Sequence, residues 1–251
     1  MEISERFEFK FVLGQDQSEA FLRAFGSCLR PDTQGGPSGV YPVVSLYYDT
    51  PDMDCYWEAW RRLPSRRKLR VRVYGSKDGT ISPSAFLEIK CKIDGKGVKH
   101  RFQTDLSNAL GLASGQASAT PVPREAVQVV EQVRRMVHIE RFEPRCVVRY
   151  RRTAFAMASL PDERAPLEEP LRITFDDAVQ HRFELLVPEP DDSRFSTSLL
   201  AEGQRILEIK GHGAMPYSLS TFLGRQQIQP TSFSKYCHAL GSLPEIAATL
   251  S

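Results

Sequence analysis

The sequence has few of the features that place a protein in a membrane, in a disulfide framework or in zinc chemistry. No apolar run approaches the roughly 20 residues that cross a bilayer, and the N-terminal stretch MEISERFEFKF lacks the apolar core of a signal peptide. The five cysteines are widely spaced without a C-x-x-C pair, and the five histidines include no H-E-x-x-H motif. These absences predict a cytoplasmic protein with reduced thiols and no zinc site.

Net charge is also small, but positive charge is concentrated locally. The formal charge of the 251 residues is only +2, with 41% hydrophobic and 25% charged residues, as in an ordinary globular protein. Two segments, RRLPSRRKLRVR at 61–72 and RCVVRYRR at 145–152, are densely cationic. Such segments favour an anionic ligand, and the alternative is a solvated basic face.

Most periodic segments alternate with a period of two, which is typical of strands with one apolar face. Helical periodicity is confined to residues 17–29, 124–138, 215–227 and 233–243, and composition predicts loops at 30–39, 107–123 and 160–170. Glycines in DGKG, at 94–97, predict a hairpin. The pattern predicts one α+β domain built on an antiparallel barrel. The expected strands are 7–13, 43–49, 68–74, 85–93, 98–103, 146–156, 171–176, 183–187 and 205–210.

Charged residues fall on one face of these strands. Residues two apart share a face, so Lys68, Arg70 and Arg72 lie together, opposite Leu69 and Val71. A charged face can simply be exposed to solvent. Surface strands usually mix Thr, Ser and Gln among their charges, however, whereas these positions hold almost only Lys, Arg and Glu. A closed sheet covered outside by helices would turn the charges into its bore.

Such a bore suits a polyphosphate chain. Arginine and lysine side chains compensate phosphate charge, and a low-dielectric wall strengthens each contact. The minority carboxylates would hold a divalent cation that bridges phosphate oxygens. The residues alone therefore indicate a phosphate-binding interior with a possible metal.

Eight segments resemble, in order, the VTC domain, which is the polyphosphate polymerase branch of the triphosphate tunnel metalloenzymes in the CYTH-like superfamily. The resemblance covers about residues 4 to 240. It implies an eight-stranded antiparallel tunnel barrel with outer helices and one domain over residues 1–251. The segments are RFEFKF, SLYYDTPDMDCY, KLRVRVYG, FLEIKCKIDGKGVKHRF, YRRTAF, LRITFD, ILEIKG and SFSKY.

The resemblance also implies roles for individual residues. Tyr150 and Ser234 would add neutral hydrogen bonds, and Lys99 and Lys210 would be further cations. For any one residue the alternative is a salt bridge inside the barrel without a ligand role. The cations implied to bind the triphosphate and the growing chain are Lys10, Arg70, Arg72, Lys90, Arg152, Arg172 and Lys235.

The implied cofactor is Mn²⁺ or Mg²⁺. Glu208 corresponds to the principal metal ligand, and Glu8, Glu88 and Asp176 are supporting carboxylates in the resemblance. The hydrolytic branch, with its triphosphatases and adenylate cyclases, typically opens with E-x-E-x-K, whereas this chain has Arg6 at the first glutamate. An arginine there removes a metal carboxylate and adds a phosphate ligand, which favours the polymerase branch.

For two segments the sequence pattern alone does not decide the local geometry. In RCVVRYRRTAF, Tyr150 and Arg152 share one face while Arg149 and Arg151 share the other, and only the Y-x-R match to the family selects the first pair. The segment 47–56, YYDTPDMDCY, is either a tunnel-mouth element or a strand followed by a turn and a helix; we favour the second.

The expected reaction is transfer of the ATP γ-phosphoryl group to inorganic polyphosphate, without a serine or cysteine nucleophile. The alternatives are a triphosphatase acting on inorganic or nucleoside triphosphate, and a non-catalytic module that binds polyphosphate or nucleic acid. Phe7, Phe9 and Phe11 lie opposite the charges, so nucleic acid is not expected. The chain contains neither a regulatory helical domain nor membrane spans, so a membrane partner protein would have to supply any coupling to transport.

Overall fold

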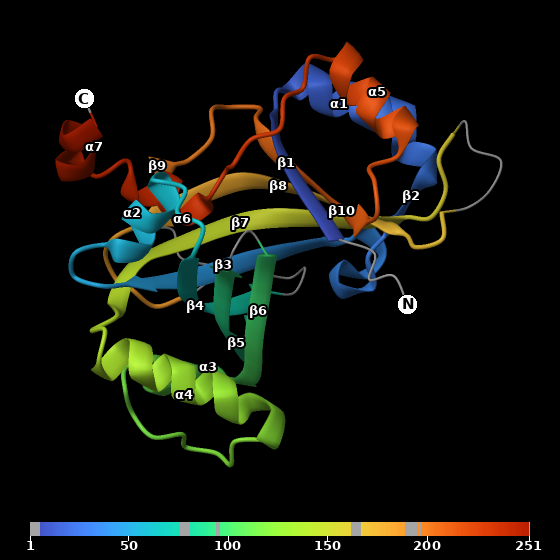
Figure 1. Ribbon diagram of the computed structural model, residues 1–251. Helices are drawn as coiled ribbons and strands as arrows, with labels where there is room; N and C mark the ends of the chain where they lie inside the picture. Colours follow the sequence, from blue (N-terminus) through green and yellow to red (C-terminus); the bar gives the residue numbers. More distant parts are fainter. Residues whose placement is uncertain are drawn as a thin grey trace. The chain divides into compact units, whose positions relative to one another are not determined.

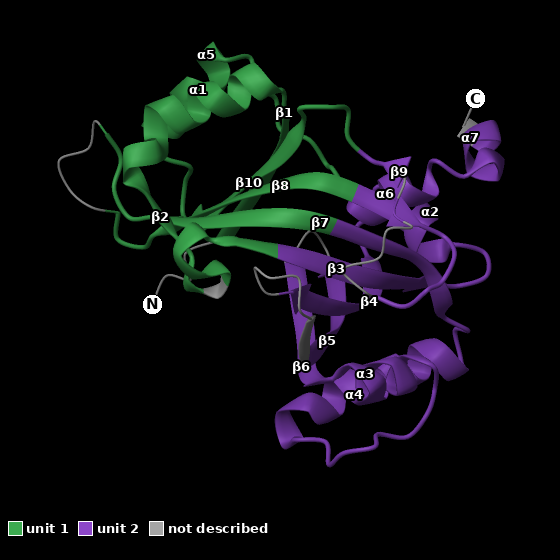
Figure 2. Ribbon diagram, turned by 180° about the vertical axis from the view of Figure 1, so that it is seen from behind, with its two compact units in different colours: residues 1–41, 150–179, 200–233 green, residues 42–149, 180–199, 234–251 purple. Residues whose placement is uncertain are grey.

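The computed structural model describes residues 6–75, 81–93, 96–161, 167–188, 195 and 197–250. The chain divides into two compact units, which Figure 2 shows in green and purple. Unit 1 comprises residues 1–41, 150–179 and 200–233, and unit 2 comprises residues 42–149, 180–199 and 234–251. Each unit is described by itself below.

The strands belong to one sheet with the order β1-β10-β8-β7-β3-β4-β5-β6, and the short strands β2 and β9 pair with β7 and β8. Every pair whose register is defined is antiparallel, from β1 with β10 to β5 with β6. The α+β class with eight long antiparallel strands is therefore confirmed. Among the described residues the pairing path has two ends, β1 and β6, so closure into a bore stays a prediction. The strands are β1 Arg6–Leu13, β2 Leu29–Pro31, β3 Val40–Asp49, β4 Arg66–Gly75, β5 Ile81–Ile93, β6 Lys96–Asp105, β7 Glu143–Met157, β8 Leu171–Arg182, β9 Thr197–Ser198 and β10 Arg205–His212.

In unit 1, helices α1 (Gln15–Phe25) and α5 (Tyr217–Arg225) lie together on one side of β1, β8 and β10 (Figure 1). Phe21 of α1 packs with its ring centroid 5.6 Å from Phe175 of β8 and 5.8 Å from Phe222 of α5. The apolar strand faces are thus covered by helices, because the alternation places every second side chain in this core. Its buried members include Phe11, Leu13, Ile173, Leu207, Ile209, Leu219 and Leu223.

In unit 2, helices α3 (Leu106–Ala113) and α4 (Arg124–His138) contact strands β5 and β6 (Figure 1). Leu69, Val71 and Leu87, which alternate with the charges of β4 and β5, are fully buried. The remaining helices of this unit are α2 (Asp54–Trp60), α6 (Lys235–Leu240) and α7 (Pro244–Leu250). In the part of the chain that the structure describes, no helix has the length and apolarity required to cross a membrane.

Three expected segments differ from the structure. Residues 183–187 do not form a strand: the Arg182 guanidinium binds the carbonyls of Leu185 and Val187 at 2.8 and 2.7 Å, and Leu185 has a positive φ of 48°. The loop expected at 107–123 contains most of α3, because the Asp105 carboxylate caps the helix by accepting the amide of Asn108 at 2.8 Å.

The loop expected at 30–39 begins within β2 and contains the 3₁₀ segment η2, Thr33–Ser38; a second 3₁₀ segment, η1, covers Gly26–Cys28. Composition rich in Gly and Pro does not distinguish a loop from such short elements. Helix α7 was not predicted. The predicted pairing through the DGKG hairpin is present between β5 and β6, although residues 94 and 95 lie outside the described part of the chain.

Candidate functional site

Unit 2 carries a strongly cationic strand surface, here called the cationic face. Adjacent strands align Lys68 of β4 with Lys90 of β5 and Lys99 of β6, and align Arg70 with Glu88 and Arg101. Directly paired residues share a face, so these side chains form rows across three strands. Within the described segments 66–72, 88–92 and 97–101, Glu88 is the sole carboxylate on this face. The cations are Arg66, Lys68, Arg70, Arg72, Lys90, Lys92, Lys99 and Arg101.

Glu88 acts as the counter-charge of this face. Its side chain is 1% exposed, and it forms ion pairs with Arg70 Nη2 at 2.6 Å and Lys99 Nζ at 2.5 Å. Burial alone would raise the pKa of Glu88, but the charges of Arg70, Arg72 and Lys99 outweigh burial and hold that pKa below its ordinary value. Burial also lowers the pKa of the Lys99 ammonium. The carboxylate is therefore ionised and held by cations.

Tyr47 and Ser45 of β3 extend this face. Arg72 is buried and donates from Nε to Ser45 Oγ at 3.0 Å, while Arg70 Nη1 donates to the Tyr47 hydroxyl at 3.3 Å. Burial tends to raise the pKa of Tyr47, yet Arg70, Arg72 and Lys235 lower it to about 8. A phenol with so low a pKa shows how positive its surroundings are.

The C-terminal SFSKY segment brings two expected residues to unit 2. Ser234 caps α6, where its Oγ accepts the amide of Cys237 at 3.3 Å, and Lys235 is the first residue of that helix. The same Oγ accepts a hydrogen bond from Lys68 Nζ at 2.7 Å. Lys68 forms no ion pair within the described part of the chain. It was not among the ligands expected from the sequence. The strand alternation could have indicated it, because Lys68 shares a face with Arg70 and Arg72.

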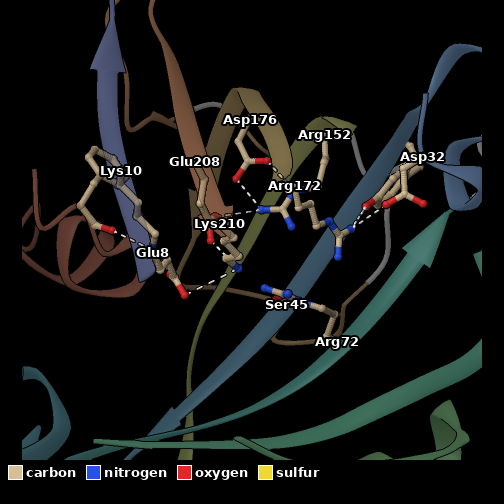
Figure 3. Close-up of polar contacts among 12 residues, drawn as sticks. Glu8, Lys10, Asp32, Ser45, Arg72, Arg152, Arg172, Asp176, Glu208 and Lys210 are labelled. Atoms are coloured by element: carbon tan, nitrogen blue, oxygen red, sulfur yellow. Dashed lines mark hydrogen bonds and ion pairs between the residues drawn. The ribbon is translucent and has the colours of Figure 1, made fainter. Parts of the chain in front are cut away.

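Unit 1 carries a different strand surface, here called the mixed face, which Figure 3 shows around Glu208. The β1 and β10 register aligns Lys10 with Glu208 and Glu8 with Lys210, and β8 aligns Arg172 with Lys210. Carboxylates and cations alternate on this face, which consists of Glu8, Lys10, Arg152, Arg172, Asp176, Glu208 and Lys210.

Each carboxylate of the mixed face has a cation partner. Lys210 Nζ lies 2.5 Å from Glu208 Oε1 and 3.6 Å from Glu8 Oε2, and Lys10 Nζ lies 3.6 Å from Glu8 Oε1. Burial would raise the pKa of Glu208, but Lys210, Lys10 and Arg152 hold it well below its usual range. Glu208 is therefore a buried, ionised carboxylate.

Arg152 links β7 to the carboxylates of the mixed face. Its Nε and Nη2 donate to Asp176 at 2.7 and 2.8 Å, and Nη2 lies 3.7 Å from Glu208. The ring of Tyr150, which is buried, lies with its centroid 5.3 Å from the Arg152 guanidinium carbon. By contrast Arg151 is exposed and pairs with Asp177 at 2.7 Å. Arg152, and not Arg151, therefore contacts the carboxylates of the mixed face.

Arg172 lies at the exposed margin of the mixed face. Its Nη2 is 3.1 Å from Asp32 Oδ2 and donates to the Tyr41 hydroxyl at 3.4 Å. Asp32 follows β2, in a segment that composition had placed in a loop, and nothing in the strand alternation indicated its contact with Arg172. Asp32 thus restrains one of the expected phosphate ligands.

The mixed face offers two carboxylates to a divalent cation that would take its other ligands from the substrate. Within the described residues, no three or more His, Cys, Asp or Glu side chains are grouped closely enough to hold a metal by themselves. Glu208 and Glu8 do converge on a single positive centre, the ammonium of Lys210. Mg²⁺ is commonly bound by one or two carboxylates together with substrate phosphates. These two side chains match that donor set, whereas no second carboxylate lies beside Glu88 on the described segments of the cationic face.

Comparison with known proteins adds the family. Residues 5–244 match the model of the VTC domain family. A proposed adenylyl cyclase from Hippeastrum, described as having a dominant triphosphatase activity, is 15% identical, with 96% of this chain and 98% of that chain covered and a TM-score of 0.51. An adenylate cyclase candidate from Bacillus halodurans is 10% identical, with 92% and 94% covered and a TM-score of 0.46. None of the curated proteins matches the chain significantly.

The two kinds of match differ in what they establish. The Hippeastrum protein, at low identity, shares the fold, which agrees with the antiparallel strand order. The family match extends over nearly the whole sequence and includes the strands of both charged faces. The chain belongs to the VTC domain family.

Proposed function

We propose that the protein is a polyphosphate polymerase that transfers the γ-phosphoryl group of ATP to the end of an inorganic polyphosphate chain. The observation that carries the proposal is the cationic face of unit 2, whose described segments 66–72, 88–92 and 97–101 present eight lysine and arginine side chains and one carboxylate, that of Glu88. Such an excess of positive charge matches a ligand with about one negative charge per phosphoryl unit. Membership of the VTC domain family supports the same substrate class.

The proposed reaction requires positioning and charge neutralisation. A terminal oxygen of the polyphosphate attacks the γ-phosphorus, the bond from that phosphorus to the oxygen bridging to the β-phosphate breaks, and ADP leaves. Charge develops on the three equatorial oxygens, and cations stabilise it best when they are already fixed in place. Arg70 and Arg72 satisfy this condition, because Glu88, Tyr47 and Ser45 hold their guanidinium groups.

The mixed face is assigned a second role in this proposal. Glu208 and Glu8 would hold Mn²⁺ or Mg²⁺, and the ion would neutralise phosphate charge when bound. Lys10 and Arg152 lie beside these carboxylates, which restrain their side chains. Lys10 is further fixed because its Nζ donates to the carbonyl of Phe233 at 3.4 Å. Both residues are assigned to phosphate oxygens.

The test is incubation of the protein with ATP and Mn²⁺, followed by separation of the products by chain length. Long-chain polyphosphate and stoichiometric ADP are expected. Release of free phosphate without polymer would contradict the polymerase and support the triphosphatase, a function described for the Hippeastrum protein that shares the fold. Polyphosphate binding without turnover would instead establish a binding module.

A further inference from the structure

A buried carboxylate joins two helices of unit 2. Asp49, the last residue of β3, is fully buried, and its oxygens accept the amides of Thr50 and Cys55 at 2.8 Å and of Tyr56 at 3.0 Å. Asp49 Oδ2 also accepts a hydrogen bond from the hydroxyl of Tyr236 in α6. The amides of Cys55 and Tyr56 fix the start of α2, and the bond from Tyr236 ties α6 to the same carboxylate. The YYDTPDMDCY segment is therefore a strand, turn and helix organised around Asp49.

Tyr236 contacts two residues of the cationic face and its extension, Lys68 and Tyr47. Its ring is buried and stacks on Tyr47, with ring centroids 5.3 Å apart and an angle of 28° between the planes. Lys68 Nζ lies 5.9 Å from the Tyr236 ring centroid, within the range of a cation–π contact. Burial and the charge of Asp49 both raise the pKa of Tyr236, so its hydroxyl remains a donor. One phenol thus contacts Asp49, Tyr47 and Lys68.

Lys68 is held from two sides by the first residues of the C-terminal segment. Its ammonium donates to Ser234 Oγ at 2.7 Å, and it lies over the ring of Tyr236, two residues further on. Lys68 forms no ion pair among the described residues, so its charge is available to an anion. A flexible lysine side chain loses conformational entropy when it is fixed. The contacts with Ser234 and the Tyr236 ring would restrict Lys68 before a ligand binds, so that less of this entropy is lost on binding.

We propose that Asp49 and Tyr236 are a positioning pair that sets Lys68 against Ser234 as one phosphate-binding group. The inference rests on the proposed function, because it assigns the group to the phosphate chain bound by the cationic face. Asp49 and Tyr236 themselves are buried and do not touch the phosphate. Their hydrogen bond acts through α6, whose first turn presents Ser234 and Lys235.

A buried carboxylate is a costly means of packing two helices. Taking an ionised carboxylate out of water is unfavourable unless hydrogen bonds satisfy its lone pairs, and apolar residues often replace buried charges without loss of stability. Asp49 instead accepts four hydrogen bonds, one from the turn at Thr50, two from α2 and one from α6. Such a bond has a direction, and it fixes the position of the Tyr236 hydroxyl at the far end of the ring, as apolar packing would not.

The experiment measures tripolyphosphate affinity by calorimetry, on the full chain, in a double-mutant cycle of Tyr236→Phe and Lys68→Met. Phenylalanine keeps the ring and its stacking on Tyr47 while removing only the hydroxyl. Tyr236→Phe should weaken binding about 5-fold and Lys68→Met about 10-fold, and the double variant should bind within about twofold of Lys68→Met alone, because both act through one group. The matched control is Tyr48→Phe, a buried tyrosine of β3 on the opposite face, paired with Leu69.

The possible results distinguish the positioning role of Tyr236 from the proposed function of the protein. Non-additive losses with an unchanged Tyr48→Phe control establish the positioning role, since a general loss of stability would not depend on Lys68. Parent-like binding by Tyr236→Phe, or losses that add fully, would overturn this inference and leave the proposed function standing. Absence of tripolyphosphate binding by the parent protein would overturn the proposed function itself, and the positioning role with it.

Discussion

The two charged faces are built from the same kind of alternating strand but balance charge in opposite ways. On the mixed face, Glu8, Asp176 and Glu208 each meet a lysine or arginine. Within the described segments of the cationic face, Glu88 is the sole carboxylate among the lysines and arginines of three strands. The first arrangement places each carboxylate beside a cation, while the second has many more cations than carboxylates on its described strand segments, which suits an anionic ligand.

This difference separates two roles that residue type alone does not separate. Glu208 and Glu88 are both buried glutamates from LEIK segments, and both have pKa values held low by neighbouring cations. Glu208 shares Lys210 with a second carboxylate, Glu8, whereas no second carboxylate lies beside Glu88 on the described segments of the cationic face. We therefore infer a metal role for Glu208 and a counter-charge role for Glu88.

The largest expected effect is that of Glu208→Gln on turnover. Glutamine keeps the shape of the side chain but lacks the charge that would hold the metal, so polyphosphate formation from ATP with Mn²⁺ should fall at least about 100-fold. Tripolyphosphate affinity measured without metal should stay within about threefold. The control is Glu125→Gln, on the exposed side of α4. If the variant retained the Mn²⁺ binding and turnover of the parent, Glu208 would have no metal role, and the two faces would not differ in this respect.

The next effect is that of Glu88→Gln on stability. The change leaves Arg70 and Lys99 without their carboxylate, and because Lys99 is partly exposed we expect a loss of about 2 kcal/mol rather than the full cost of a broken buried pair. Tripolyphosphate should raise the melting temperature of the variant more than that of the parent, since it supplies the missing negative charge. Equal melting temperatures of variant and parent would contradict the counter-charge role.

Acid should diminish the effect of Glu88→Gln. The pKa of Glu88 in the folded protein lies below the ordinary value of 4.5, so its contribution to stability is present above that value and is lost as the pH falls through the lowered pKa. Urea unfolding at a series of pH values should show the difference between parent and variant shrinking below pH 4.5. A difference that did not depend on pH would show that packing, and not charge, is responsible.

A smaller effect is expected from Lys90→Met on the cationic face. Removal of one cation from the lysine row should weaken tripolyphosphate binding about 10-fold, which corresponds to about 1.4 kcal/mol, and should reduce the dependence of affinity on salt. Calorimetry at two salt concentrations measures both quantities. Arg134→Met, on the exposed side of α4, is the matched control. If both variants lost affinity equally, binding would depend on the net charge of the protein and not on the position of the cation on the cationic face.

The smallest effect concerns Tyr47 and pH. Its pKa of about 8 lies below the ordinary value of 10.0, so ionisation stabilises the folded protein increasingly between those values. The same tyrosinate places a negative charge beside Arg70, and raising the pH from 7 to 9 should weaken tripolyphosphate binding a few-fold more in the parent than in Tyr47→Phe. Tyrosinate absorbance during a pH titration gives the midpoint directly. If tripolyphosphate affinity depended on pH in the same way in both proteins, ionisation of Tyr47 would have no effect on the bound phosphate.

Much of the fold could be predicted because alternation is a local property. Residues such as Leu69 and Val71 must leave water, so the opposite face of β4 necessarily carries Lys68, Arg70 and Arg72. Local pattern failed where a tertiary contact decided the backbone, as at residues 183–187, whose carbonyls bind the Arg182 side chain. It also missed α3, because Asp105 caps a helix within a stretch that composition assigned to a loop.

The sequence by itself determined the antiparallel α+β class, the faces of the strands and the types of charge on them, because each depends on neighbours one or two positions away. Only the tertiary structure decided which charges meet. The register that sets Glu8 beside Lys210, and the return of Ser234 and Tyr236 to Lys68 and Asp49, join residues far apart in the chain. Such contacts follow from strand pairing and helix packing, which no short segment encodes alone.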